Sequence, residues 1–538
     1  MATRATLVVL CLIAAVRPLH AQMDMHEHRG PAPAYLGRVH FPASCSPAAA
    51  AAVERGVALL HSFWYEEAGK VFRQAAAADP GCAMAYWGEA TSLLHPLWQP
   101  PTAEEMATGT ALVERARAAH PATAREQGYV ASIGAFFDDS GPQFADRLRA
   151  WDEALARLHE AQPADTEAAI FYALGLIAVA QASPTDTTYA RQRLAGDILE
   201  PLFQSQPDHP GLAHYLIHAY DSPALADRAV RAANRYAGIA PSVPHARHMP
   251  SHIYTRLGMW DASIASNASS MAASLRYERE RHATAVWDQR LHAMDYLAYA
   301  YLQQGRDGAA KRLVTAAAAV RSFEPSNSIA ATYALAAIPA RYALERGRWR
   351  DAAALPVRAD LAEPGASAIT QFARAVGAAR AGDTAAARAA LDALSVIDDD
   401  LGARHVPIWS GTVHAQRLAA AAWVALATGD SAGAVSFAGQ AADLEDATEK
   451  HPVTPGAILP ARELQGDLLL RLGRPAEALA AYRASLSRAP GRARGLLGAA
   501  RAADAAGDAT AGREYRRQYA VLRRHADAAP RPPAASGT

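Results

Sequence analysis

With 538 residues, the chain is too long for one ordinary compact core, so its length favours several domains or an array of repeats. Apolar residues make up 51% and charged residues 20%, which is the composition of a folded, soluble protein. Lys and Arg total 53, as do Asp and Glu, so no net charge attracts nucleic acid or an anionic membrane, and nucleic-acid binding is disfavoured.

The first 21 residues have the pattern of a signal peptide. Arg4 precedes an apolar run from Ala5 to Val16, and the small residue Ala21 is the expected cleavage point. That run is too short to span a membrane, and no later stretch reaches spanning length without charges. Together with an Ala- and Arg-rich composition typical of a bacterial GC-rich genome, this predicts a periplasmic or secreted protein. Residues 22–34 are expected to be disordered.

Two cysteines, Cys45 and Cys82, remain after removal of this segment. In an oxidising compartment two thiols usually pair, so we expect a disulfide that fastens the N-terminal segment to the first repeat. A buried pair of free thiols is the alternative.

Residues 35–255 are predicted to form an N-terminal helical region of the tetratricopeptide-repeat (TPR) type. Gly56, Leu59, Ala68, Phe72 and Pro80 match the repeat's positions for small, large, small, aromatic and helix-stopping residues. One helix pair cannot bury its apolar stripe alone, so such units have to stack.

Histidines are concentrated near the end of this region, where six of the 20 lie between His209 and His252. His214 and His218 are four residues apart in a short predicted helix, which places both imidazoles on one face, as ligands of a single ion require. Asp221 follows one turn later. Its carboxylate is either a third ligand or an acceptor that orients an imidazole.

A second pair, His248 and His252, flanks Pro250, and His245 precedes it in a loop. Since proline suits the first turn of a helix, His252 should lie in that turn and His248 just before it. Imidazole ligands would suit zinc or copper, and three of them with an open position could activate water for hydrolysis. Alternatively, these histidines only pack between helices and bond carbonyl groups freed by the prolines.

Residues 256–527 are predicted to continue as a second TPR-like solenoid. Seven glycines end helical stretches at intervals between 34 and 47 residues, and a small residue follows each by five positions. The glycines are Gly258, Gly305, Gly347, Gly382, Gly429, Gly473 and Gly507, and the small residues are Ser263, Ala310, Ala352, Ala387, Ala434, Ala478 and Gly512. Glycine permits the turn, and the small residue permits close helix approach. The predicted fold is therefore an all-α, TPR-like α-solenoid, with residues 528–538 disordered.

Solenoids of this type bind extended ligands on their concave face, so aromatic and polar side chains there are candidates for binding. The candidates are Trp64, Trp87, Glu89, His95, Trp98, His292, Asp295 and Trp409. The alternative is that the aromatic residues belong to the core and the charged ones are solvated.

Several motifs are more specific than the repeat pattern: Phe41–Cys45 (FPASC), Leu60–Tyr65 (LHSFWY), Cys82–Gly88 (CAMAYWG), His214–His218 (HYLIH), His248–Tyr254 (HMPSHIY), Val453–Gly456 (VTPG) and Pro460–Glu463 (PARE). With these motifs the chain resembles a family of secreted bacterial TPR-containing proteins. The resemblance implies a helical repeat fold and export, and it implies no activity.

Three functions follow as hypotheses. The first is an exported scaffold that binds a peptide, protein or glycan in the bacterial envelope. The second is a zinc or copper protein with a histidine-lined site, including a metal-dependent hydrolase, and the third is a purely structural assembly factor of the envelope. The chain has no Gly-x-Ser-x-Gly, phosphate-loop or dinucleotide-binding signature, so a binding protein is favoured over an enzyme.

Overall fold

The computed structural model describes residues 35–138, 141, 143–361, 363–404 and 407–527. The predicted signal peptide (1–21) and the segments 22–34 and 528–538 lie outside these residues. Within the described ranges no helix combines the length and apolar character that crossing a membrane requires.

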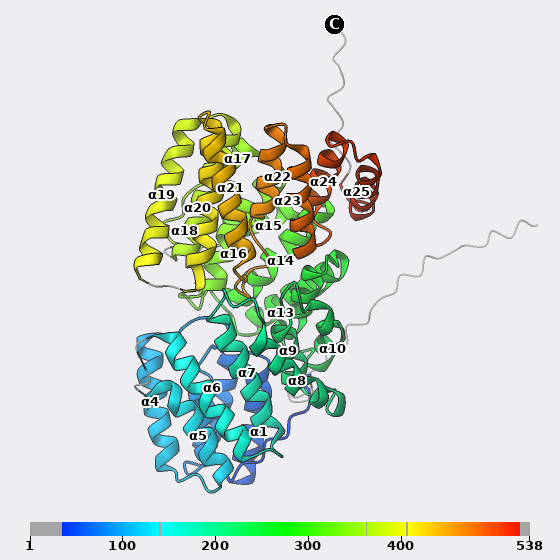
Figure 1. The fold of residues 1–538 in the computed structure, drawn as a ribbon. Helices are drawn as coiled ribbons and strands as arrows, with labels where there is room; N and C mark the ends of the chain where they lie inside the picture. Colours follow the sequence, from blue (N-terminus) through cyan, green and yellow to red (C-terminus); the bar gives the residue numbers. More distant parts are fainter. Residues whose placement is uncertain (1–34, 139–140, 142, 362, 405–406, 528–538) are drawn as a thin grey trace, which may run out of the picture.

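The N-terminal part of the chain is a succession of antiparallel helices (Figure 1). They are α1 (Pro47–His61), α2 (Tyr65–Ala78), α3 (Ala83–Thr91), α4 (Ala103–Ala118), α5 (Ala124–Phe137), α6 (Phe144–Ala161), α7 (Thr166–Gln181), α8 (Ala190–Ser205), α9 (Pro210–Ala219), the 3₁₀ helix η2 (Ala226–Ala229), α10 (Val230–Ile239), α11 (Pro244–His248) and α12 (Pro250–Arg256).

The C-terminal part continues in the same way. Its helices are α13 (Trp260–Glu280), α14 (Asp288–Gln304), α15 (Asp307–Ala319), α16 (Ile329–Glu345), α17 (Trp349–Ala353), α18 (Pro364–Ala381), α19 (Thr384–Ala403), α20 (Pro407–Ala427), α21 (Ser431–Asp446), α22 (Ala461–Arg471), α23 (Pro475–Arg488), α24 (Ala493–Ala505) and α25 (Ala509–Leu522). The strands of the described residues are β1 (Val286–Trp287) and β2 (Phe323–Glu324), which form one short parallel pair. The predicted all-α solenoid is confirmed.

The glycine turns behave as the sequence predicts. All seven glycines have positive φ angles, between 64° and 90°, a conformation that other residues rarely adopt. The small residue five positions after each glycine is buried in every case. These side chains lie early in the second helix of each pair, where bulk would separate the two axes. A glycine turn followed five positions later by a small buried residue is therefore the local pattern shared by the helix pairs of the C-terminal part.

Enlarging one of these small residues should destabilise the fold. Ala387 in α19 has no exposed surface and packs where α19 meets α18. We expect Ala387→Leu to lower the free energy of unfolding by about 1–3 kcal/mol, because the added methyl groups have no space. Ala389→Leu, at an exposed position of the same helix, is the control and should change stability by less than about 0.5 kcal/mol. Urea unfolding followed by circular dichroism measures both variants, and equal shifts would contradict the packing explanation.

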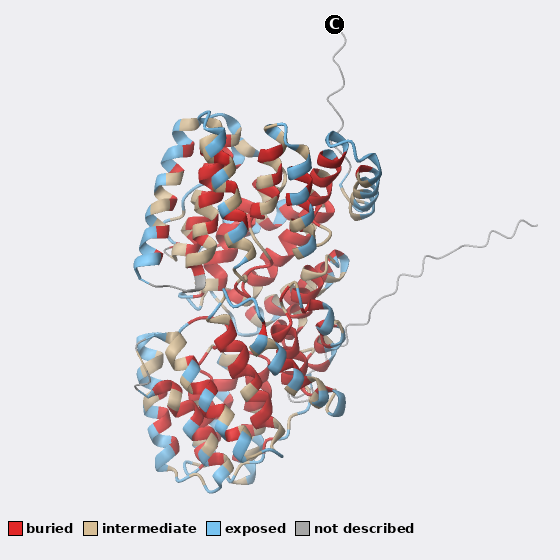
Figure 2. Ribbon diagram, viewed as in Figure 1, coloured by how far each residue is buried: buried red, intermediate tan, exposed pale blue. Residues whose placement is uncertain are grey.

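Buried side chains form two large cores (Figure 2). The first draws its residues from Leu36 to Tyr254, and the second combines Trp98 with residues from Trp260 to Leu468. A small third cluster covers α22 to α24. The helices α9 and α14 lie near the junction of the two parts in Figure 1, and α11 contacts α14 while α12 contacts α9. The histidine-rich segments are therefore at the centre of the molecule.

Two features secure the N-terminal repeat. Cys45 and Cys82 are joined by a disulfide, which ties the segment before α1 to the start of α3. Phe72 fills the space between α1 and α3, and a Cβ atom on Gly56 or Gly88 would lie within 3 Å of its ring. Both glycines are required for this close approach rather than for a turn.

A half-buried carboxyl group between α21 and α22 provides a pH-dependent prediction. Glu445 accepts a hydrogen bond from the amide of Ala461 at 2.7 Å, and burial raises its pKa to about 7. The folded state thus disfavours the charged form of Glu445. The contribution of this group to the free energy of unfolding, which is present at acid pH, is therefore lost as the pH rises through 7. We expect Glu445→Gln to be more stable than the wild type at pH 8 by about 1–2 kcal/mol, and equally stable near pH 4.5. Thermal unfolding at both pH values tests this, and a pH-independent difference would contradict it.

Candidate metal centre

Six buried histidines come together between the two large cores. They are contributed by α9 (His214 and His218), α11 (His245 and His248), α12 (His252) and α14 (His292). The most exposed of them, His218, shows only 8% of its surface. Buried imidazoles need partners for their nitrogen atoms, so the contacts of each ring define what the site can do.

Local sequence explains how these short helices arise. Pro210 and Pro244 each occupy the first turn of their helix, and Pro250 begins α12 directly after α11. Proline fixes the backbone angle suited to a first turn and ends the preceding helix. As a result His252 lies in the first turn of α12, as the sequence indicates, and His248 ends α11 just before it. His245, which was expected in a loop, lies instead in the first turn of α11, because Pro244 begins that helix.

The first triad consists of His214, His218 and His245. The Nε2 atom of His214 lies 3.1 Å from Nε2 of His245 and 3.1 Å from Nε2 of His218. One nitrogen from each ring lies within 4.8 Å of the others. Three imidazole nitrogens at this spacing can bind one metal ion, which sits about 2 Å from each nitrogen.

The second triad consists of His248, His252 and His292. Nε2 of His248 lies 3.0 Å from Nε2 of His252, and the ring centroids of His248 and His292 are 4.2 Å apart. One nitrogen from each ring again lies within 4.8 Å of the others. Both ring nitrogens of His292 are buried without a hydrogen-bond partner. A buried polar group without a partner costs free energy, so this ring points to a ligand.

Two of the rings are fixed in orientation and tautomer by groups that only accept hydrogen bonds. Nδ1 of His214 lies 2.7 Å from the backbone oxygen of His61, and Nδ1 of His252 lies 2.8 Å from Oδ2 of Asp221. Since a carbonyl and a carboxylate accept, each Nδ1 atom carries the hydrogen and donates it. Nε2 of each neutral ring therefore carries a lone pair.

Amide side chains fix two further rings. Nδ1 of His248 lies 2.7 Å from Oδ1 of Asn267, whose nitrogen donates to the backbone oxygen of Ser263. Nδ1 of His245 lies 3.1 Å from Oε1 of Gln289, whose nitrogen donates to a neighbouring carboxylate. Each amide thus offers its oxygen to the imidazole, and Nδ1 is again the donor. Histidines that bind metal typically donate the hydrogen of their other ring nitrogen to an acceptor that orients the ring.

The tautomers place lone pairs against lone pairs. Nε2 of His214 faces Nε2 of His245, and Nε2 of His248 faces Nε2 of His252, at 3.1 and 3.0 Å. A proton shared between two rings would relieve the repulsion. However, burial lowers the pKa of every ring in both triads, and that of His245 falls to about 3. Burial therefore disfavours a proton shared between the rings, and two lone pairs that face each other can be bridged by a cation.

Asp221 lies beside the second triad in a supporting position. Its carboxylate accepts hydrogen bonds from Arg256 and Lys450, each at 2.8 Å, as well as from His252. Burial opposes its ionisation, but these two cations hold the pKa of Asp221 well below its usual range. Of the two roles open to Asp221 from sequence, the structure places it in the second, that of orienting an imidazole.

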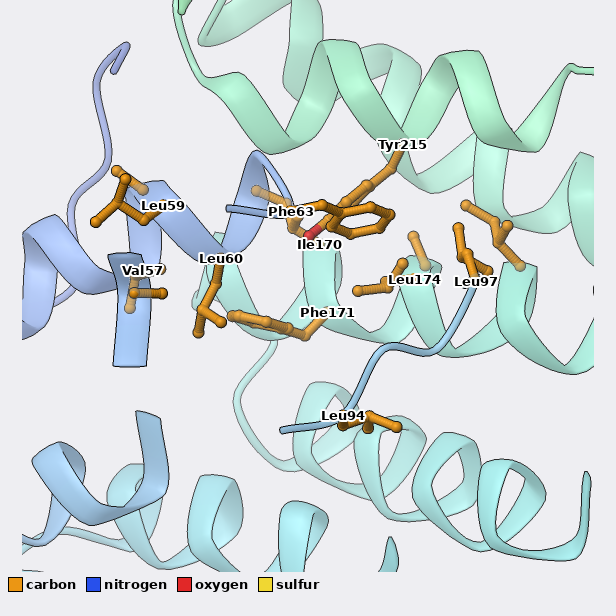
Figure 3. Packing of buried hydrophobic residues seen from close by; sticks show 14 of the residues in the cluster. Val57, Leu59, Leu60, Phe63, Leu94, Leu97, Ile170, Phe171, Leu174 and Tyr215 are labelled. Atoms are coloured by element: carbon orange, nitrogen blue, oxygen red, sulfur yellow. The ribbon is translucent and has the colours of Figure 1, made fainter. Parts of the chain in front are cut away.

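Aromatic side chains surround the triads. The ring of Phe63 lies 4.4 Å from that of His214, and Trp98 lies 5.1 Å from His292, between ring centroids. Tyr296 covers His248 at 4.8 Å. Figure 3 shows the ring of Tyr215 beside that of Phe63 in the first core, which backs the first triad. The aromatic rings shield most of the site from water.

A small cleft reaches the first triad from the surface. It has a volume of about 60 Å³, and its lining includes Tyr189, His218, Asp221 and Lys450. His218 is therefore the ligand candidate nearest to solvent. Small ions and molecules can approach the triads through this opening.

A third histidine cluster lies behind the first triad but needs no metal. Glu167 accepts hydrogen bonds from Nε2 of His61 at 2.8 Å and from Nε2 of His209 at 2.9 Å. The remaining nitrogens also have partners, since Nδ1 of His61 contacts the Tyr215 hydroxyl at 3.0 Å. Burial raises the pKa of Glu167, but the two imidazoles outweigh it and hold that pKa well below its usual range. This cluster fixes the His61 carbonyl that orients His214.

The other residues proposed from sequence are divided between this site and the rest of the molecule. Trp98 and His292 lie at the triads, but the remaining six do not contact them. Trp64 packs on Tyr277, Trp87 on Phe41, His95 on Tyr65 and Trp409 on Tyr333, while Glu89 pairs with Arg73 and Asp295 with Arg341.

From sequence, His292 was expected only among the binding residues and not among the candidate metal ligands. Two further contributors to the site, Asn267 and Gln289, were given no role. These residues lie on α13 and α14, outside the histidine-rich segment. Their spacing along the chain carries no signal, because only the packing of α11 and α12 against α13 and α14 brings them to the imidazoles.

Comparisons with known proteins address the fold. The family model of the tetratricopeptide repeat matches residues 459–492, which contain α22 and α23. Among curated proteins, none matches the chain. Similar solved structures include a human IFIT1 dimer with PPP-AAAA (11% identity, 88% of this chain and 90% of that chain, TM-score 0.37) and yeast Tom70 (11%, 88% and 92%, 0.32). Another is the APC/C hetero-tetramer Cut9-Hcn1 (12%, 87% and 93%, 0.28).

These likenesses concern the fold alone. The repeat matched at residues 459–492 has the same glycine turn and buried small residue as the other six pairs of the C-terminal part. The match to the tetratricopeptide repeat thus covers one helix pair of a chain whose described residues form successive antiparallel helices.

Proposed function

We propose that this chain is a metalloprotein that binds transition-metal ions of the zinc and copper class in its two histidine triads. The observation that carries the proposal is the pair of Nε2–Nε2 contacts at 3.0 and 3.1 Å, in which acceptors on the far side of each ring leave two lone pairs facing each other. A cation converts this repulsion into two bonds. The helical repeats supply the rigid frame, since the ligands come from four separate helices.

Metal analysis of the full chain tests the proposal. The purified protein is equilibrated separately with zinc(II) and with copper(I), freed of unbound metal, and measured by mass spectrometry. We expect about two ions per chain in the wild type, and loss of about half of this metal, the ion of the first triad, in the double variant His214→Ala/His218→Ala. The control is His40→Ala/His525→Ala, which removes two exposed histidines and should retain the metal. Protein that holds neither ion, or a control that loses metal equally, would overturn the proposal.

If the chain is exported, its histidine triads would bind metal ions outside the cytoplasm. We propose a periplasmic or secreted location on the basis of the charged residue, apolar run and small residue at positions 4–21. Fractionation of cells and N-terminal sequencing test this location. A mature chain that begins at Gln22 is expected, whereas an uncleaved chain in the cytoplasm would contradict the assignment.

The TPR-type fold is also consistent with a protein-binding scaffold, and a second pocket favours this as a second candidate. It has a volume of about 140 Å³ and is lined by side chains that include Arg462, Arg488 and Gln416. We propose that it receives a segment of a protein or peptide partner in the bacterial envelope, with a glycan as the other ligand class. A photo-crosslinking residue at Gln416 should capture a partner that the same residue at exposed Val396 does not. Equal crosslinking at both positions would argue against a specific partner.

A further inference from the structure

The two triads lie next to each other in one buried region. The ring centroids of His218 and His252 are 5.9 Å apart, and those of His245 and His248 are 6.0 Å apart. Each of these pairs joins one triad to the other. Since an ion lies about 2 Å from its imidazole nitrogens, ions bound in the two triads would be near neighbours. Such ions can share a ligand, so the triads are two halves of one centre.

The charge around the triads discriminates between metals. All six ligand candidates are imidazoles, which bind metal as neutral rings, and among the described residues Asp221 is the one carboxylate that bonds to any of them. Its charge is already balanced by Arg256 and Lys450. Two divalent ions would therefore bury four uncompensated positive charges, whereas two copper(I) ions would bury two. Imidazole nitrogen is a good ligand for copper.

We propose that the two triads hold a pair of copper(I) ions as one dinuclear unit, and that this unit binds dioxygen in the gap between the ions. The proposal rests on the metal-binding function above and names the metal, its number and its small-molecule ligand. Its carrying observations are the three-and-three division of the ligands, the short distances between the triads and the absence of a carboxylate ligand among the described residues.

Electrons and charge balance in this step. Each copper(I) ion gives one electron and becomes copper(II), and dioxygen accepts the two electrons and becomes a peroxide dianion that bridges the ions. The O–O bond remains, and no proton is taken up or released. The charge of the centre stays at two before and after binding, because the dianion compensates the higher charge of the metals. The neutral imidazole shell therefore suits both states.

The surroundings fit a small, uncharged ligand. Phe63, Trp98 and Tyr296 cover the triads, and the cleft of about 60 Å³ reaches them at His218. A cleft of this small volume suits a diatomic molecule better than a bulky substrate, and the aromatic shell limits the water that would displace the bridging ligand. The site therefore favours binding of dioxygen over reaction with a bulky substrate.

Anaerobic titration with copper(I) tests the number of ions. The full chain, stripped of metal, is titrated with a copper(I) complex, and we expect two ions per chain. Air is then admitted, and uptake of one dioxygen per two copper ions is measured with an oxygen electrode. Electron paramagnetic resonance should show no copper(II) signal, because the two unpaired electrons are coupled through the bridge.

The possible results separate this inference from the proposed function. Two copper ions with one dioxygen and a silent resonance spectrum support the dinuclear centre. One copper ion per chain, or two that give the signal of isolated copper(II), would overturn it while leaving the metal-binding function intact. Zinc(II) bound at two per chain with no stable copper(I) would likewise overturn it. No bound metal of any kind would remove both proposals.

Single variants test the division into triads. His245→Ala removes a ligand from the first triad and His292→Ala one from the second, and each should leave one tightly bound copper and abolish dioxygen uptake. His40→Ala, at an exposed position, should keep two ions and full uptake. A variant that retains uptake would contradict the assignment of its histidine. Far-ultraviolet circular dichroism verifies that the variants are folded. If a variant does not fold, the number of copper ions and of dioxygen molecules bound by the wild type decides whether the centre is dinuclear.

Discussion

Replacing Asn267 by leucine is expected to weaken metal binding by about 10–100-fold, although this residue is not a ligand candidate. Oδ1 of Asn267 accepts the hydrogen of His248 Nδ1 at 2.7 Å. Leucine has a similar volume but no acceptor, so the ring is free to rotate and to move its hydrogen to Nε2. A chelator competition titration with copper(I) or zinc(II) measures the affinity.

The control for this variant is Asn234→Leu. Asn234 also accepts a hydrogen bond from a ring side chain, the hydroxyl of Tyr254 at 2.8 Å, but it lies at the exposed surface of α10. We expect its metal affinity to equal that of the wild type. If both variants bind metal as tightly as the wild type, the supporting role of Asn267 is wrong.

Replacing Arg492 by methionine is expected to lower the free energy of unfolding by about 3–5 kcal/mol. The guanidinium group is fully buried and bonds Glu463 at 2.7 Å, Glu345 at 2.7 Å and the hydroxyl of Tyr299 at 2.5 Å. Without it, two buried carboxylates face each other with no cation between them. Because these side chains come from α14, α16 and α22, the loss affects several repeats at once. The midpoint of urea unfolding reports the change.

Arg483→Met provides the matched control. This arginine contacts Tyr515 and Asp508, but half of its side chain is exposed, so its ion pair is screened by water. We expect a change of less than about 0.5 kcal/mol. Equal effects of the two substitutions would show that burial of the Arg492 network adds nothing to stability.

The C-terminal repeats could be predicted because their determinants are local. A glycine with positive φ and a small buried residue five positions later, such as Gly382 and Ala387, lie within two adjacent helices. The glycine and the small residue determine the hairpin through contacts within about one helical turn of themselves. The short strands β1 and β2 were not predicted, since two residues each give no alternating pattern.

The centre could be predicted only in part. Spacing of four residues identified His214 with His218 and His248 with His252, because helical periodicity alone aligns such pairs. Spacing could not show that the two pairs belong to different triads, nor that His245 completes the first. The histidines that the hypothesis assigned to one shared site do lie in one region, where together with His292 they form two adjoining triads.

The sequence by itself determined the helical repeats, the positions of their turns and the concentration of imidazoles in one stretch, since each depends on residues close together in the chain. Tertiary structure alone decided what those imidazoles face. His292 joins them from α14, and the acceptors Asn267 and Gln289 that set their tautomers come from α13 and α14. The physical reason is that a hydrogen bond or a metal site requires groups within a few ångströms, and helix packing, not chain order, sets those distances.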